Sequence, residues 1–84
     1  MNYNVTSTED YSSKQVLQFI KNGNKYRIEL YNRDTKELAS IQLENIEQAT
    51  SIYLKFVDFM LKGYYSFEQR KNILEKNGSV NYGI

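Results

Sequence analysis

The longest apolar pattern in this chain lies between residues 46 and 65, and it predicts a helix. At about 100° per residue, the polar positions of this stretch gather on one face roughly 100° wide. The rest of the circumference is apolar, about twice the width of the stripe on an ordinary surface helix. We therefore expect this helix to be covered on two sides, by a sheet and by a second surface. The polar positions are Glu47, Gln48, Ser51, Lys55, Asp58 and Lys62.

The apolar part of this helix divides into a central line and two shoulders. One shoulder carries Ile52 and Phe59, and the other carries Leu54 and Leu61. Residues about seven apart share a helix face, so the line between the shoulders is predicted to contact the sheet. That line consists of Ile46, Tyr53, Phe56 and Met60.

Upstream of the helix, apolar and polar residues alternate with a period of two, which predicts strands at 16–20, 26–31 and about 39–43. Asn22-Gly23 between the first two strands is a preferred pair for a two-residue hairpin loop. With that loop, Phe19 opposes Tyr26 and Leu17 opposes Ile28, and all four side chains share one face.

The third strand extends this apolar face when it pairs with the second in one particular register. Leu30 then opposes Ala39, so one face of the sheet is apolar across three strands. The other pairs in this register are Ile28 with Ile41 and Tyr26 with Leu43.

Residues 8–22 also admit a helical interpretation. Ser7 or Thr8 would cap that helix, and Gly23 would end it as the glycine that follows a helix C-terminus. The polar run at 12–15 breaks the apolar stripe that such a helix would need. We favour the strand.

Capping signals set the limits of two helices. Asn45 and Gln48 form a capping pair at the start of the long helix, and Gly63 can end it. Ser66 and Gln69 repeat the capping pattern, which predicts a second helix closed by residues 77–78.

These elements predict an α+β fold. It is a three-stranded antiparallel β-meander packed on one long C-terminal helix at 46–62, followed by a short helix at 67–76. We expect a polar N-terminal arm at 1–13, a single domain at 14–78 and a loose C-terminal tail at 79–84.

Composition limits the chemistry. The 84 residues carry a net charge of +1 and contain neither His nor Cys. The usual general base, thiol nucleophile and structural zinc ligands are therefore missing. Glu44 and Glu47 suit a helix N-terminus better than half of an acid/base site. We predict no enzyme activity, no cofactor, no metal site and no small-molecule substrate. Without a signal peptide or membrane span, a soluble cytoplasmic protein is expected.

Two surfaces are candidates for binding. The sheet face turned away from the helix carries Lys25, Arg27 and Tyr31, which makes a nucleic-acid-binding or regulatory protein the alternative function. The leading candidate is the aromatic stretch at the end of the long helix. Either the second helix covers this stretch, or it binds a protein partner, which is a second copy or a host protein. The predicted contact residues are Phe56, Phe59, Tyr64, Tyr65 and Phe67.

The arrangement over residues 16–76 resembles small accessory and anti-defence proteins of phages and mobile elements, including anti-CRISPR inhibitors. Residues 53–59, Tyr-Leu-Lys-Phe-Val-Asp-Phe, are the closest local similarity. This resemblance implies an inhibitor of a host protein that acts by steric occlusion or by stabilising an inactive state. The apolar excess of the long helix adds the expectation of a dimer. The near-neutral charge departs from inhibitors that imitate DNA, which are strongly acidic, so charge mimicry is not expected.

Overall fold

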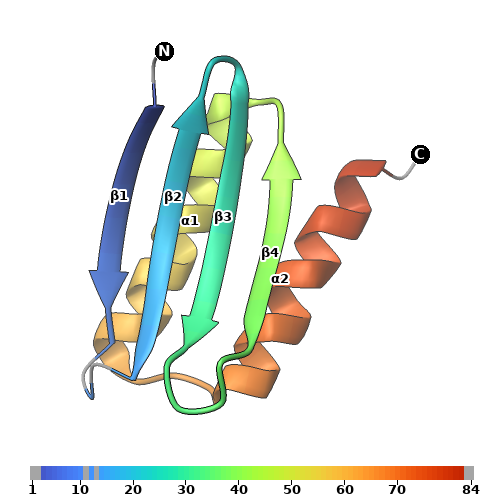
Figure 1. The fold of residues 1–84 in the computed structure, drawn as a ribbon. Helices are drawn as coiled ribbons and strands as arrows, with labels where there is room; N and C mark the ends of the chain where they lie inside the picture. Colours follow the sequence, from blue (N-terminus) through green and yellow to red (C-terminus); the bar gives the residue numbers. More distant parts are fainter. Residues whose placement is uncertain (1–2, 11, 13, 83–84) are drawn as a thin grey trace.

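The computed structural model describes residues 3–10, 12 and 14–82, which form a four-stranded antiparallel sheet and two helices (Figure 1). Neighbours along the chain are neighbours in the sheet, in the order β1-β2-β3-β4. One helix, α1, crosses one face of the sheet, whereas α2 lies alongside β4 (Figure 1). The predicted α+β class is confirmed, with one strand more than expected. The elements are β1 (Tyr3–Glu9), β2 (Gln15–Asn22), β3 (Lys25–Asn32), β4 (Leu38–Leu43), α1 (Ile46–Lys62) and α2 (Phe67–Tyr82).

Strand β1 occupies most of the segment that was expected to be a loose arm. It pairs with β2, with Val5 opposite Ile20 and Thr6 opposite Phe19. The hydroxyl groups of Thr8 and Tyr53 are hydrogen bonded at 2.8 Å, which attaches β1 to α1. The prediction of three strands was therefore wrong. The β-branched polar residues of β1 suit an exposed edge strand, but they do not produce the apolar alternation from which the other strands were predicted. Residues 1, 2, 11 and 13 of the expected arm lie outside the described residues.

Strand β2 settles the choice between strand and helix for the stretch before Gly23. The hairpin loop consists of Gly23 and Asn24, since Asn22 pairs with Lys25. Phe19 therefore opposes Ile28, and the predicted register is wrong by two residues. A shift of two preserves the face of every side chain, so the apolar face survives the error. Gly23 has φ 66°, a left-handed conformation that glycine adopts without strain.

The register of β3 against β4 agrees with the prediction. Leu30 opposes Ala39, and Ile28 opposes Ile41. These side chains are buried beneath the helices, so the apolar face of the sheet forms one side of the hydrophobic core.

Side chains of α1 form the other half of the core. Phe56 and Met60 have no exposed surface, and Tyr53 is nearly buried against Phe19. Ile46 was predicted to lie on the same sheet-facing line but is 48% exposed. Seven residues fall about 20° short of two helical turns, so the line drifts, and Ile46 lies at its outer end.

Both predicted helix starts have the expected caps. At α1, the Gln48 N–H donates to the Asn45 side-chain oxygen at 2.9 Å. At α2, the Ser66 N–H donates to the Gln69 side chain at 2.9 Å, and the Gln69 N–H donates to the Ser66 hydroxyl at 3.2 Å. Gly63 ends α1 with φ 69°.

Helix α2 continues through the residues that were expected to end it. Gly78 is buried inside the helix, and a Cβ on it would lie 2.5 Å from Cγ2 of Ile41. This glycine therefore allows α2 to approach β4 closely and does not terminate the helix. The expected loose tail is corrected accordingly: residues 79–82 belong to α2, and residues 83–84 lie outside the described part of the chain.

Candidate protein-interaction site

The five predicted contact residues divide between the core and the surface. Phe56 has no exposed surface and Phe67 is 7% exposed, so both belong to the core. Phe59 is half-buried, whereas Tyr64 and Tyr65 are 49% and 50% exposed. We call Phe59, Tyr64 and Tyr65 the aromatic tip. It lies at the turn between α1 and α2.

The rings of the aromatic tip form a chain of edge-to-face contacts that starts in the core. Ring centroids are 5.1 Å apart for Phe56 and Phe59, 4.9 Å for Phe59 and Tyr65, and 6.1 Å for Tyr65 and Tyr64. Edge-to-face pairs are the favoured aromatic geometry and contribute about 0.5–1.5 kcal/mol each beyond burial. The exposed tyrosines are thus connected to a fixed support.

The backbone of the tip is held in an unusual conformation. Gly63 has φ 69°, which suits glycine, but Tyr65 has φ 70°. A bulky residue in this region is an outlier that costs about 1–3 kcal/mol and persists only where the surroundings enforce it. The turn therefore holds the Tyr65 ring against Phe59 at the expense of local strain.

Arg70 on α2 supplies the constraint. Its Nε donates to the Tyr64 carbonyl at 2.7 Å, and its Nη2 donates to the Phe59 carbonyl at 3.3 Å. Arg70 is only 3% exposed, and burial lowers the pKa of its guanidinium, while the charge of Asp10 acts in the opposite direction. The guanidinium is thus a donor to the Tyr64 carbonyl in the turn and a further donor to the Phe59 carbonyl, which also accepts from the main-chain N–H groups of Gly63 and Tyr64.

Lys62 lies beside the tip. Its Nζ is 3.1 Å from an Asp58 carboxylate oxygen and 5.9 Å from the centre of the Tyr64 ring. The hydrogen bond and charge of Asp58 raise the pKa of Lys62 above its ordinary value. The cation over the ring is in the range of a cation–π contact, which restrains Tyr64 from the other side.

A second apolar surface lies on the flank of α1. The shoulder that carries Ile52 and Phe59 is largely covered, with Ile52 only 7% exposed. The opposite shoulder remains open: Leu54 is 58% exposed and Leu61 is 70% exposed. Together with Ile46 at its start, we call these residues the α1 shoulder. The second cover predicted for this helix therefore reaches only one side of it.

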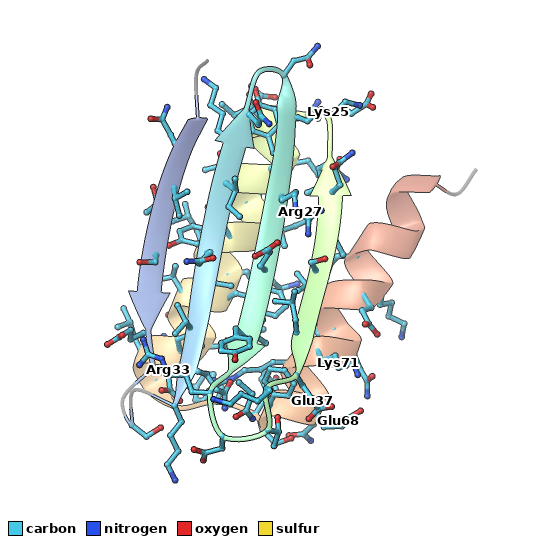
Figure 2. The ribbon with its side chains drawn as sticks, viewed as in Figure 1. Lys25, Arg27, Arg33, Glu37, Glu68 and Lys71 are labelled. Carbon is cyan, nitrogen blue, oxygen red and sulfur yellow. The ribbon has the colours of Figure 1, made fainter. Side chains whose placement is uncertain are left out.

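The face of the sheet opposite α1 carries the residues of the nucleic-acid alternative. Figure 2 shows Lys25 and Arg27 on β3. Lys25 Nζ is 3.3 Å from Glu44, and Arg27 Nη2 is 2.7 Å from Glu29. Each cation thus has a carboxylate beside it, which lowers the positive potential that phosphates would need. Tyr31 is half-buried further along the same strand, two positions beyond Glu29.

Within residues 3–10, 12 and 14–82, no group of three or more His, Cys, Asp or Glu side chains is arranged to hold a metal ion. No helix in that part of the chain is long and apolar enough to cross a membrane.

Sequence reasoning identified the tyrosines of the tip but not their support. Nothing in the sequence signals Arg70, because an arginine in a polar helix is normally solvated. Leu54 and Leu61 were identified as a shoulder but not as a site. One feature of the sequence could have indicated that this shoulder stays exposed: the apolar face of α2 is too short to cover both shoulders of α1.

Comparison of the chain with protein-family models, with curated proteins and with solved structures finds no match.

Proposed function

We propose that this chain is a non-enzymatic protein-binding module that contacts its partner through Tyr64 and Tyr65. The observation that carries the proposal is that Tyr65 is half-exposed while its backbone has φ 70°. This backbone conformation places the Tyr65 ring against Phe59, with the ring centroids 4.9 Å apart. Strain that persists in a native structure is often associated with a functional site.

The tip has the properties of an interaction hot spot. Tyrosine is enriched at the centres of protein interfaces, where its ring buries apolar area and its hydroxyl forms hydrogen bonds. Contacts with Phe59 and Lys62 restrain the two rings before any partner arrives. Such preorganisation reduces the entropy lost on binding and so increases affinity.

The mode of action that we propose is steric occlusion of the partner's surface, as in a phage or mobile-element inhibitor of a host protein. This part of the proposal rests on the resemblance in layout alone. The near-neutral net charge of +1 favours recognition by shape and aromatic contact over electrostatic steering.

Site-specific photocrosslinking in cells of the source organism tests the proposal. A benzophenone amino acid at Tyr64 is expected to give a discrete adduct with a host protein. The same probe at Leu38, which is 52% exposed on the opposite face of the sheet, is the matched control and is expected to give none.

A second variant tests the role of the aromatic tip. Tyr65→Asn keeps a residue that tolerates positive φ but removes the ring, so it is expected to abolish the adduct formed at position 64. Failure to form an adduct at Tyr64, or the same adduct at Leu38, would contradict the proposal.

A further inference from the structure

The two edges of the sheet differ. Helix α2 lies alongside β4, whereas β1 pairs with β2 and has no strand on its other side among the described residues (Figure 1). Natural proteins usually protect such an edge with lysine, proline or a covering element. Residues 4–7 of β1, Asn-Val-Thr-Ser, are exposed and uncharged. Glu9 at the end of the strand is already bound by Arg33 at 2.6 Å.

The hydrogen-bond pattern shows which groups of β1 face outward. The Asp10 N–H donates to the Gln15 carbonyl at 3.0 Å, which extends the β1–β2 ladder by one pair. Main-chain groups alternate in direction along an antiparallel strand. Asn4, Thr6 and Thr8 therefore direct their N–H and C=O groups toward β2, whereas Val5 and Ser7 direct theirs away from the sheet.

The α1 shoulder lies on the same side of the molecule as this open edge. Tyr53, which lies at the edge of the sheet-facing line next to the α1 shoulder, reaches β1 through its hydrogen bond with Thr8. The opposite flank of α1 turns toward the tip and α2, where Phe59 contacts Tyr65 and Arg70. Unpaired backbone groups and exposed aliphatic side chains thus adjoin one another.

The α1 shoulder is complementary to itself. Leu54 is its centre, with Ile46 eight residues before it and Leu61 seven residues after it. Two such helices in antiparallel orientation would place Leu54 against its counterpart and Ile46 against Leu61. The same arrangement brings Glu47 near one end toward Lys62 near the other, so Lys62 would lie between Asp58 of its own helix, which is 3.1 Å away, and Glu47 of the second copy.

We propose that β1 and the α1 shoulder form the interface for a second copy of this chain, related by a two-fold axis. The two β1 strands pair antiparallel and join the sheets, and the two shoulders face each other on one side of the joined sheet. Both element pairs are antiparallel, as a two-fold axis perpendicular to the sheet requires. No contact in this interface involves Tyr64 or Tyr65, so the proposal stands independently of the function proposed for the aromatic tip.

Sedimentation of the full chain over a hundredfold concentration range tests this inference. The expected result is a concentration-dependent species of twice the chain mass of 10.0 kDa. Leu54→Glu places two carboxylates together at the axis, so it is expected to weaken association at least about tenfold. Leu38→Glu is the matched control, because Leu38 has similar exposure on another face, and it should leave association unchanged.

Edge pairing is tested with proline. Ser7→Pro removes an outward N–H without removing a bond to β2, so it is expected to prevent dimerisation while circular dichroism remains native. Gln42→Pro makes the same change on β4, where the groups of Gln42 also point away from the neighbouring strand, and dimerisation should persist. If Ser7→Pro unfolds the chain, Leu54→Glu and its control decide the outcome. A monomer at every concentration, or equal weakening by Leu54→Glu and Leu38→Glu, would overturn the proposal.

Discussion

Arg70 and Gln15, which lie 55 residues apart in the chain, are joined by a hydrogen bond of 2.8 Å between Nη1 and Oε1. The same guanidinium donates to the Phe59 carbonyl in the last turn of α1 and to the Tyr64 carbonyl beyond it, and contacts the Met60 sulfur at 3.1 Å. One buried side chain on α2 thus connects the start of β2, the end of α1 and the turn that carries the aromatic tip. The orientation of the tip depends on residues that do not belong to it.

Removing this connection should destabilise the whole protein. Arg70→Met retains much of the apolar contact but leaves the Phe59 and Tyr64 carbonyls without their side-chain donors. We expect a loss of about 2–4 kcal/mol in the free energy of unfolding, measured by urea denaturation. Lys71→Met is the control: Figure 2 shows Lys71 near Glu37, but the atoms are 3.9 Å apart, and the loss should stay below about 0.5 kcal/mol. Equal losses for the two variants would contradict this role for Arg70.

The close approach of α2 to β4 predicts a coupling between Gly78 and Ile41. Gly78→Ala should destabilise the protein by about 1–3 kcal/mol, because the new methyl group meets a β-branched side chain that cannot move away. In the Ile41→Ala background the same change should cost at least about 1 kcal/mol less, since the obstructing Cγ2 is absent. A double-mutant cycle from denaturation curves measures the difference. Additive effects would show that the contact carries no energy.

Lys36 offers a stabilising change. It has φ 66° in the loop between β3 and β4, where its N–H donates to the Asn32 carbonyl at 2.8 Å. Lys36→Gly should raise the free energy of unfolding by up to about 1 kcal/mol, because glycine adopts this conformation without strain. The neighbouring Thr35→Gly should lower it instead, because glycine gains freedom in the unfolded chain and the hydrogen bonds between the Thr35 hydroxyl and Glu37 are lost. Thermal melts of the two variants are therefore expected to shift in opposite directions.

The pair of Asp58 and Lys62 predicts a titration effect. Asp58 raises the pKa of Lys62, so Asp58→Asn should lower that pKa, as followed by the chemical shift of the Lys62 side-chain carbon next to Nζ. Because the pKa of Lys62 is raised in the folded protein, the pair stabilises the fold fully at pH values below the ordinary lysine pKa. That contribution is lost as the pH rises through the raised pKa. An unchanged Lys62 titration in the variant would show that the pair does not form in solution.

The nucleic-acid alternative makes a separate prediction. Because Lys25 and Arg27 each have a carboxylate partner, we expect no salt-dependent retention of single-stranded nucleic acid in filter binding at two salt concentrations. Glu29→Gln removes the negative charge beside Arg27 without altering side-chain size and provides a sensitised variant. Binding by the unmodified chain that falls steeply with salt would favour the alternative function over the protein-binding module.

The sequence was most informative where period-two alternation and capping residues agree. The pairs Leu30–Ala39 and Ile28–Ile41, and the cap at Asn45, all follow from local patterns that the structure retains. In these places the apolar face and the local chemistry favour the same structure.

Errors arose where tertiary contacts override local signals. Strand β1 lacks apolar alternation, since residues 4–7 are all exposed, and it is held by its pairing with β2 and by the Thr8–Tyr53 hydrogen bond. Gly78 has the identity of a helix terminator but serves a close helix–strand contact. Within the candidate site, Phe56 and Phe67 could not be distinguished from the exposed tyrosines, because all are aromatic and only the path of α2 decides which are covered.

The unequal edges of the sheet also bear on how far the protein can assemble. Strand addition at both edges would allow endless growth, which is the route to fibres. With α2 alongside β4, pairing through β1 consumes the exposed edge of each copy in the described part of the chain. Association by this route therefore ends at two molecules. The uncharged edge that would otherwise favour aggregation is then paired inside the dimer.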